Sequence, residues 1–247
     1  MRRYILFFIT SLLIAFGLAD YALQKQYANT DTGLVMSFDS PLPTANVKVK
    51  VTASPVPTAL PATVSLTVPY TMQAPYNVWD PLHEDACEET SLIMVKHFLD
   101  GTTIATQAQA DQEIRDMIAW EGTHGYGPSI TLAQLNQIAA DYYGLHDGKV
   151  VTISSVDDLK AVVAAGHPAI LGMAGKLLPN PYFSNGGPNY HMLVAKGYDA
   201  TGFIANEPGT FHGDGFHYNY DVFYNAIHDW NAQDILQGQK AYLAFGA

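Results

Sequence analysis

The sequence contains a single cysteine, Cys87, so no disulfide can form within the chain. One cysteine beside nine histidines also leaves no Cys–His spacing of the zinc-finger kind. Basic residues are scarce: 12 lysines and arginines stand against 23 aspartates and glutamates, which gives a formal net charge of -11. Because so acidic a surface repels a phosphate backbone, we expect no nucleic-acid partner.

Charged residues of both signs make up only 14% of the chain, whereas 48% of its residues are hydrophobic and 12% are aromatic. This balance is typical of a well-buried domain and argues against a disordered chain. A length of 247 residues suffices for one sizeable core but not for several large domains.

The first 19 residues have the pattern of a targeting segment. Residues 1–3 are basic, and an apolar run covers residues 4–19 before the first acidic residue, Asp20. The run is short for a membrane-spanning helix of about 20 residues. It can therefore be a cleaved signal peptide, an uncleaved membrane anchor or a buried N-terminal helix. The first two interpretations predict an extracytoplasmic protein, either secreted or anchored by its N-terminus.

Residues 20–63 are expected to form a spacer, because prolines recur there among threonine, alanine, serine and valine. The folded domain is predicted at residues 64–247. Its elements run from helices to mostly strands, which indicates an α+β fold rather than the βαβ alternation of a doubly wound sheet. Helices are predicted at residues 107–120, 131–143, 156–165 and 221–230, after one that begins at Cys87 and ends at Asp100-Gly101, and strands at residues 64–70, 149–153, 169–174, 191–198, 202–206 and 241–245.

Cys87 is the first candidate for a chemical role. With Asp85 as the expected N-cap and Glu88 in the capping-box position, the cysteine would be the second residue of a helix. Free N–H groups and the helix dipole stabilise a thiolate there. Nearby acids, among them Glu88 and Glu89, oppose that effect, so a cationic partner would be required. A buried structural cysteine is the other interpretation.

His191 is the best candidate partner, because it begins an apolar strand directly after a polar turn. An antiparallel neighbour ending at Asn206 and Glu207 would bring one of these two side chains close to the imidazole and hold its tautomer. Since side chains alternate along a strand, only one of the two can point into the cleft. Gln73, in the loop before the helix, could donate to an oxyanion together with the Cys87 N–H.

Three runs of sequence resemble a known family. The run QAPYNVWDPLHEDACEETSLIMVKHFL has a Gln, a variable loop and a Cys at a helix start; TLAQLNQIAADYYGL and LKAVVAAGHPAILGM have the matching helices; YHMLVAKGYDATGFIANEPGT has the His strand and its successor. In this order they are similar to the bacteriocin-processing (double-glycine leader) peptidase-like domains, family thirty-nine-like cysteine peptidases of the papain-like superfamily. The resemblance spans residues 68–245.

This resemblance implies a papain-like α+β fold with helices packed on an antiparallel sheet. It also implies that Cys87 is the nucleophile, His191 the general base and Gln73 the oxyanion donor. The family has Asp before the proline where this chain has Glu207, so either Glu207 or Asn206 is expected to orient the imidazole. Glu88 and Glu89 after the cysteine, and the long loop between the glutamine and the cysteine, are further departures from the family pattern.

The sequence thus predicts an exported thiol hydrolase that cleaves a peptide or amide bond, with no cofactor and no metal. Its partner would be a peptide or protein substrate, such as a cell-wall peptide, and the membrane if the N-terminal segment is retained. A catalytically inactive domain with a binding or scaffolding role at the cell surface is the alternative. A zinc site is another, since His83-Glu84-x-x-Cys87 imitates half of a zincin motif. Six aromatic residues could line a substrate cleft or simply pack: Tyr76, Trp79, Tyr126, Tyr182, Phe183 and Tyr190.

Overall fold

The structure, a computed structural model, describes residues 59–247. The predicted targeting segment, residues 1–19, and most of the predicted spacer, residues 20–63, lie outside these described residues. Within residues 59–247, no helix is both long and apolar enough to cross a membrane.

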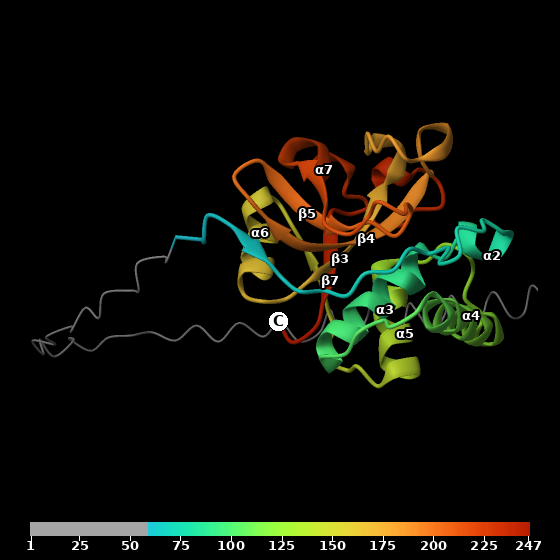
Figure 1. The fold of residues 1–247 in the computed structure, drawn as a ribbon. Coiled ribbons are helices and arrows are strands. Elements are labelled where there is room, and N and C mark those ends of the chain that lie inside the picture. The colour runs from blue at the N-terminus through green and yellow to red at the C-terminus, as the bar shows by residue number, and fades with distance from the viewer. Residues whose placement is uncertain (1–58) are drawn as a thin grey trace, which may run out of the picture. The chain divides into compact units, whose positions relative to one another are not determined.

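One antiparallel sheet organises the domain (Figure 1). Its strands follow the order β2-β7-β3-β4-β5-β6, and β1 pairs with β4 beside this path. The long central strand β4 therefore has neighbours along both edges, and every one of its residues is buried. The strands are β1 (Val64–Ser65), β2 (Lys149–Thr152), β3 (Ala169–Ala174), β4 (Tyr190–Tyr198), β5 (Gly202–Asn206), β6 (Phe216–Asn219) and β7 (Ala241–Ala244).

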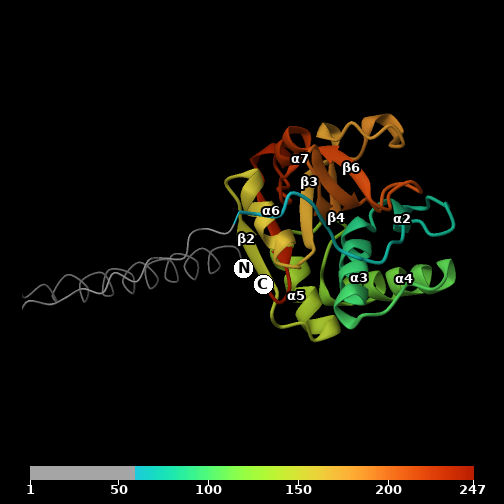
Figure 2. The same cartoon turned by 60° about the vertical axis from the view of Figure 1, so that its left-hand side comes forward.

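Helices cover both faces of this sheet, as Figures 1 and 2 show. Alternate residues of β4 belong to different cores: Met192 and Val194 pack with α3, α4 and α5, whereas Leu193 and Ala195 pack with α6 and α7. A strand buried on both faces must be apolar at successive positions, and this explains the continuous apolar run after His191. The helices are α2 (Pro81–Glu84), α3 (Cys87–Asp100), α4 (Gln107–His124), α5 (Leu132–Tyr143), α6 (Val156–Ala164) and α7 (Tyr220–Ala226).

The predicted α+β class and papain-like architecture are confirmed, and local signals explain most helix ends. Thr131 caps α5 through a capping box with Gln134, and Ser155 caps α6 in the same way. Gly101 ends α3 with a φ of 65°, a left-handed conformation that suits glycine.

The predicted start of the cysteine helix was wrong by one residue. Pro81–Glu84 forms the separate short helix α2, which begins with proline after the N-cap Asp80. Asp85 is the C-cap of α2, so Ala86 takes the N-cap position of α3 and Cys87 is its first residue. Three other predictions were wrong: β6 was missed, the expected strand 64–70 forms pairs only at Val64–Ser65, and the helix expected at residues 221–230 ends at Ala226, after which Ile227 bridges to β3.

Candidate active site

Cys87 lies where helix α3 meets the sheet. The N-cap Ala86 has no side chain that could accept a hydrogen bond, so no side chain caps the first turn of α3. The N–H groups of that turn are the donors that a helix start leaves without helical partners. Cys87 and His191 both line a cleft of about 730 Å³ that runs between the helical part and the sheet.

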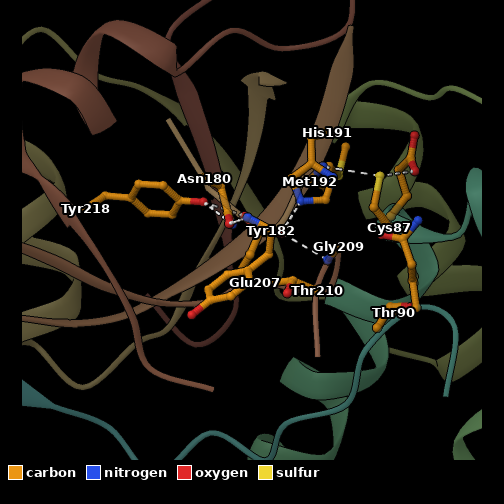
Figure 3. Close-up of polar contacts among 12 residues, drawn as sticks. Cys87, Thr90, Asn180, Tyr182, His191, Met192, Glu207, Gly209, Thr210 and Tyr218 are labelled. Atoms are coloured by element: carbon orange, nitrogen blue, oxygen red, sulfur yellow. Dashed lines mark hydrogen bonds and ion pairs between the residues drawn. The ribbon is translucent and has the colours of Figure 1, made fainter. Parts of the chain in front are cut away.

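The thiol of Cys87 is buried, with 5% of the residue exposed. Its S–H donates to Glu88 Oε2 at 2.9 Å. The backbone N–H of Met192 donates to the sulfur at 3.3 Å (Figure 3). Burial, followed by the negative charge of Glu88, raises the pKa of the Cys87 thiol well above its ordinary value. Both effects favour the protonated thiol, so a base is needed to activate Cys87.

His191 occupies the second position of β4, next to the residue that touches the Cys87 sulfur. Its Nε2 contacts Glu207 Oε1, as Figure 3 shows, and its ring packs edge-on against Phe183 with the ring centroids 5.5 Å apart. Within the described residues, Nδ1 forms no hydrogen bond, and none joins His191 to Cys87. The pairing of Nε2 leaves Nδ1 as the nitrogen that can exchange a proton in the cleft.

Glu207 directly follows β5 and is fully buried. Besides His191, its carboxylate accepts a hydrogen bond from the Gly209 N–H at 3.0 Å and from the Tyr218 hydroxyl at 2.9 Å (Figure 3). The Asn180 amide in turn donates to the Tyr218 oxygen at 3.1 Å. Donors therefore reach both oxygens of Glu207, so this buried carboxyl group is fully hydrogen-bonded.

Asn206 points away from His191. Its amide Nδ2 donates to the carbonyls of Val68 and Pro69 at 3.1 and 3.0 Å. The structure thus brings Glu207, and not Asn206, to the imidazole, as strand alternation requires for neighbouring residues. Asn206 instead ties the segment before α2 to the sheet.

Gln73 does not present its amide to the cleft as predicted, although the residue lines it. The Nε2 group donates to the carbonyls of His83 and Glu84 at 2.8 and 3.1 Å. The unexpected helix α2 places these two carbonyls there, and they occupy the hydrogens that an oxyanion would need. The structure therefore leaves the backbone N–H groups at the start of α3 as the available donors.

His83 is held by carboxylates on both sides, which argues against the zincin-like alternative. Its Nδ1 lies 2.8 Å from Asp80 Oδ1, and its Nε2 lies 2.8 Å from Asp111 Oδ1. Both ring nitrogens are thus occupied within the protein. In residues 59–247, no group of three or more His, Cys, Asp or Glu side chains is arranged to hold a metal ion.

Of the six aromatic residues considered from the sequence, four line the cleft: Trp79, Tyr182, Phe183 and Tyr190. Tyr126 instead stacks on Trp120, and Tyr76 is exposed outside the cleft lining.

Three acidic side chains are buried beside the site, on α3 and α4. Glu88, Glu89 and Glu121 are only 1%, 3% and 4% exposed. Burial raises the pKa of Glu88 to about 7. Burial, together with the charges of Glu88 and Glu121, raises the pKa of Glu89 well above its ordinary value.

Two contacts of the site were missed from the sequence. The first is the hydrogen bond between Glu88 and the thiol, although the adjacency of the two residues was a usable signal. The second is the support of Glu207 by Tyr218, which lies on the unpredicted strand β6. No sequence pattern indicated the second contact.

A domain that sets a cysteine at a helix start against a histidine on the central antiparallel strand has the papain-like arrangement. A model of the Peptidase_C39 like family matches residues 65–235, and the chain belongs to this family. A solved structure described as a candidate C39-like peptidase from Bacillus anthracis is also similar. It is 17% identical, the match covers 75% of this chain and 98% of the other, and the TM-score is 0.49. No curated protein matches the chain.

Proposed function

We propose that this domain hydrolyses a peptide or amide bond, with Cys87 as nucleophile. One observation carries the proposal: the thiol and an imidazole held by a buried carboxylate line the same cleft. This combination of nucleophile, imidazole and orienting carboxylate is the arrangement that acyl transfer uses on unrelated folds. Membership of a peptidase-like family supports the same reaction class.

The mechanism begins when the Cys87 thiol gives its proton to a base within hydrogen-bond reach and Sγ attacks the substrate carbonyl, with His191 carrying its own proton at this point. Backbone N–H groups at the start of α3, that of Cys87 first, stabilise the oxyanion that forms. His191 donates a proton to the leaving amine and then takes one from the water that hydrolyses the thioester. Glu207 holds the imidazole in the tautomer and orientation that this exchange requires.

The test uses the full-length protein and a mixture of peptides from digested protein, followed by mass spectrometry of newly formed termini. The proposal expects cleavage by the unchanged protein and its loss to background in Cys87→Ala and His191→Ala. Cleavage that survives in Cys87→Ala would refute the thiol mechanism.

A binding role is the second candidate, and two observations favour it. The Cys87 thiol donates a hydrogen bond to Glu88, and the Gln73 amide is occupied by backbone carbonyls. Peptides that are retained by the protein but left uncut, equally in the unchanged protein and in Cys87→Ala, would establish binding in place of hydrolysis.

We also propose that the domain acts outside the cytoplasm, on a peptide or protein such as a cell-wall peptide. The basic and then apolar start of the chain supports this location. Fractionation of expressing cells tests it: recovery of the protein in the cytoplasmic fraction would contradict it.

A further inference from the structure

We propose that Glu88 is a further catalytic residue, whose carboxylate takes the proton of the Cys87 thiol as the sulfur attacks. In the sequence-based prediction this task belonged to His191. The inference rests on the proposed hydrolase function and assigns the two proton transfers of acylation to different residues. Glu88 would serve the nucleophile, and His191 would serve the leaving group.

The contacts of the thiol carry this assignment. The S–H already donates to Glu88 Oε2 at 2.9 Å, whereas no hydrogen bond joins it to His191 within the described residues. A proton acceptor must lie within hydrogen-bond reach of the proton that it removes. In this geometry Glu88 meets the requirement without any movement.

The surroundings of Glu88 suit a carboxyl group that accepts and releases a proton. The carboxyl group is buried and lines the cleft, and its second oxygen, Oε1, has no hydrogen-bond partner among the described residues. Buried carboxyl groups are usually hydrogen-bonded at both oxygens, as Glu207 is. With one oxygen on the thiol and the other without a partner, Glu88 is placed to accept a proton.

The short distance between the two groups also means that Glu88 must hold the thiol proton while Cys87 is a thiolate. A thiolate and a carboxylate at this short distance in a buried site would repel one another strongly. Once Glu88 is protonated, its O–H can donate to the sulfur, and the Met192 N–H provides a second donor at 3.3 Å. The thiolate is thus stabilised by a hydrogen bond from the Glu88 carboxyl group, which carries the former thiol proton.

The titratable groups that face Glu88 come from α3 and β4. They are Cys87 and Glu89 on α3, and Tyr190 and His191 on β4. Of these groups, His191 is the one able to carry a positive charge. With the pKa of Glu88 raised to about 7 by burial, the carboxylate is a better base than an ordinary glutamate and is still ionised at mildly alkaline pH.

The proton balance closes over one turnover. During acylation the S–H bond breaks, the proton bonds to Glu88, the sulfur bonds to the carbonyl carbon, and His191 gives its proton to the departing amine. During deacylation His191 takes a proton from water, the hydroxide adds to the thioester, and the departing sulfur recovers the proton from Glu88. The net reaction is hydrolysis of one amide, and both residues return to their starting states.

The test measures how fast iodoacetamide alkylates the full-length protein across a range of pH. Because the chain has one cysteine, the extent of modification reports on Cys87 alone. In the unchanged protein the rate should rise through an inflection near the pKa of Glu88, about 7. In Glu88→Gln the inflection should vanish, and the rate at pH 8 should fall about 10²-fold, the smallest effect typical of a lost general base.

Two further variants keep the result interpretable. Glu84→Gln removes an exposed acid from the same cleft without touching the thiol, so the curve of the unchanged protein is expected. Glu88→Asp keeps a carboxylate and should retain the inflection at a lower rate, provided that thermal melting shows both Glu88 variants to be folded. Alkylation of Glu88→Gln that is equally fast or faster, or an inflection that persists in it, would overturn the assignment.

The peptide-cleavage assay separates this failure from failure of the proposed function. If Cys87→Ala abolishes cleavage while Glu88→Gln leaves it unchanged, the hydrolase stands and the role of Glu88 falls. If Cys87→Ala still cleaves, both proposals fall.

Discussion

Two buried carboxyl groups flank the reactive side chains, and they are held in opposite ways. Glu207, on the sheet side, meets the His191 ring, a hydroxyl and a backbone N–H. Glu88, on the helix side, meets one thiol and leaves one oxygen without a partner. The first environment holds a carboxyl group in one orientation, and the second leaves a carboxyl group with an oxygen that can accept a proton. One cleft therefore combines an orienting carboxyl group with one placed to take the thiol proton.

The largest expected effect comes from replacing the carboxyl group of Glu207 on the sheet side. Glu207→Gln can keep the contacts to Tyr218 and Gly209 but replaces the carboxyl group that orients the His191 ring with an uncharged amide. We expect cleavage to fall by about 10²–10⁴-fold, the scale of a general acid–base contribution, with little change in melting temperature. The measurement is kcat/KM on a cleaved peptide beside the melting temperature.

The control for this variant is the neighbouring Asn206→Ala. It removes hydrogen bonds to the Val68 and Pro69 carbonyls, so we expect a loss of about 1–3 kcal/mol of stability and a much smaller loss of activity. If Asn206→Ala abolished activity in a folded protein and Glu207→Gln did not, the contrast between these two residues would be reversed.

The buried acidic residues on the helix side should make the free energy of unfolding depend on pH. The pKa of Glu89 is raised in the folded protein, so this protein binds more protons than the unfolded chain at pH values above the ordinary 4.5. Stability from this group is therefore fully present at low pH and is lost as pH rises. In Glu89→Gln the slope of unfolding free energy against pH should flatten by about 1.4 kcal/mol per pH unit.

Urea unfolding at several pH values between 5 and 8 measures that slope. The matched control is Asp116→Asn, on the exposed side of α4, which should retain the slope of the unchanged protein. If Glu89→Gln also retained the slope of the unchanged protein, the pKa of Glu89 would not be raised in the folded protein.

The smallest expected effect comes from removing one donor from Glu207, so that one of its oxygens lacks a partner, as in Glu88. Tyr218→Phe removes one donor from the Glu207 carboxylate and leaves Oε2 without that partner. We expect a loss of about 1–3 kcal/mol in unfolding free energy and a drop in cleavage of about tenfold. An unchanged activity with unchanged stability would mean that the hydroxyl does not support the carboxylate.

The sequence predicted much of the site because its residues carry local signals. Cys87 begins a helix and His191 begins an apolar strand, and both patterns can be read within a few residues. Asp85 misled the prediction, because Asp80 and Pro81 start a separate helix that takes the intervening residues. This short helix also supplies the carbonyls that hold Gln73, so one local error produced a second one in the site.

The choice between Asn206 and Glu207 could not be made from the sequence. Alternation shows that one of the two faces the cleft, but the choice depends on the register of β5 with β4, in which Asn206 lies opposite Val194. The contact between Tyr218 and Glu207 depends on β6, whose four residues are too few for their alternation to indicate a strand. Long-range pairing of this kind is fixed by the tertiary fold and leaves no local signal.

The most direct test of Cys87 as nucleophile is mass spectrometry of the full-length protein after reaction with para-nitrophenyl acetate. This ester has a good leaving group, so acylation needs little help from His191, whereas hydrolysis of the thioester needs the imidazole to activate water. We expect His191→Ala to accumulate an acetyl group on Cys87 and Cys87→Ala to show no such group at position 87. Ester turnover that is equal in all three proteins, with no acetyl group on Cys87, would contradict it.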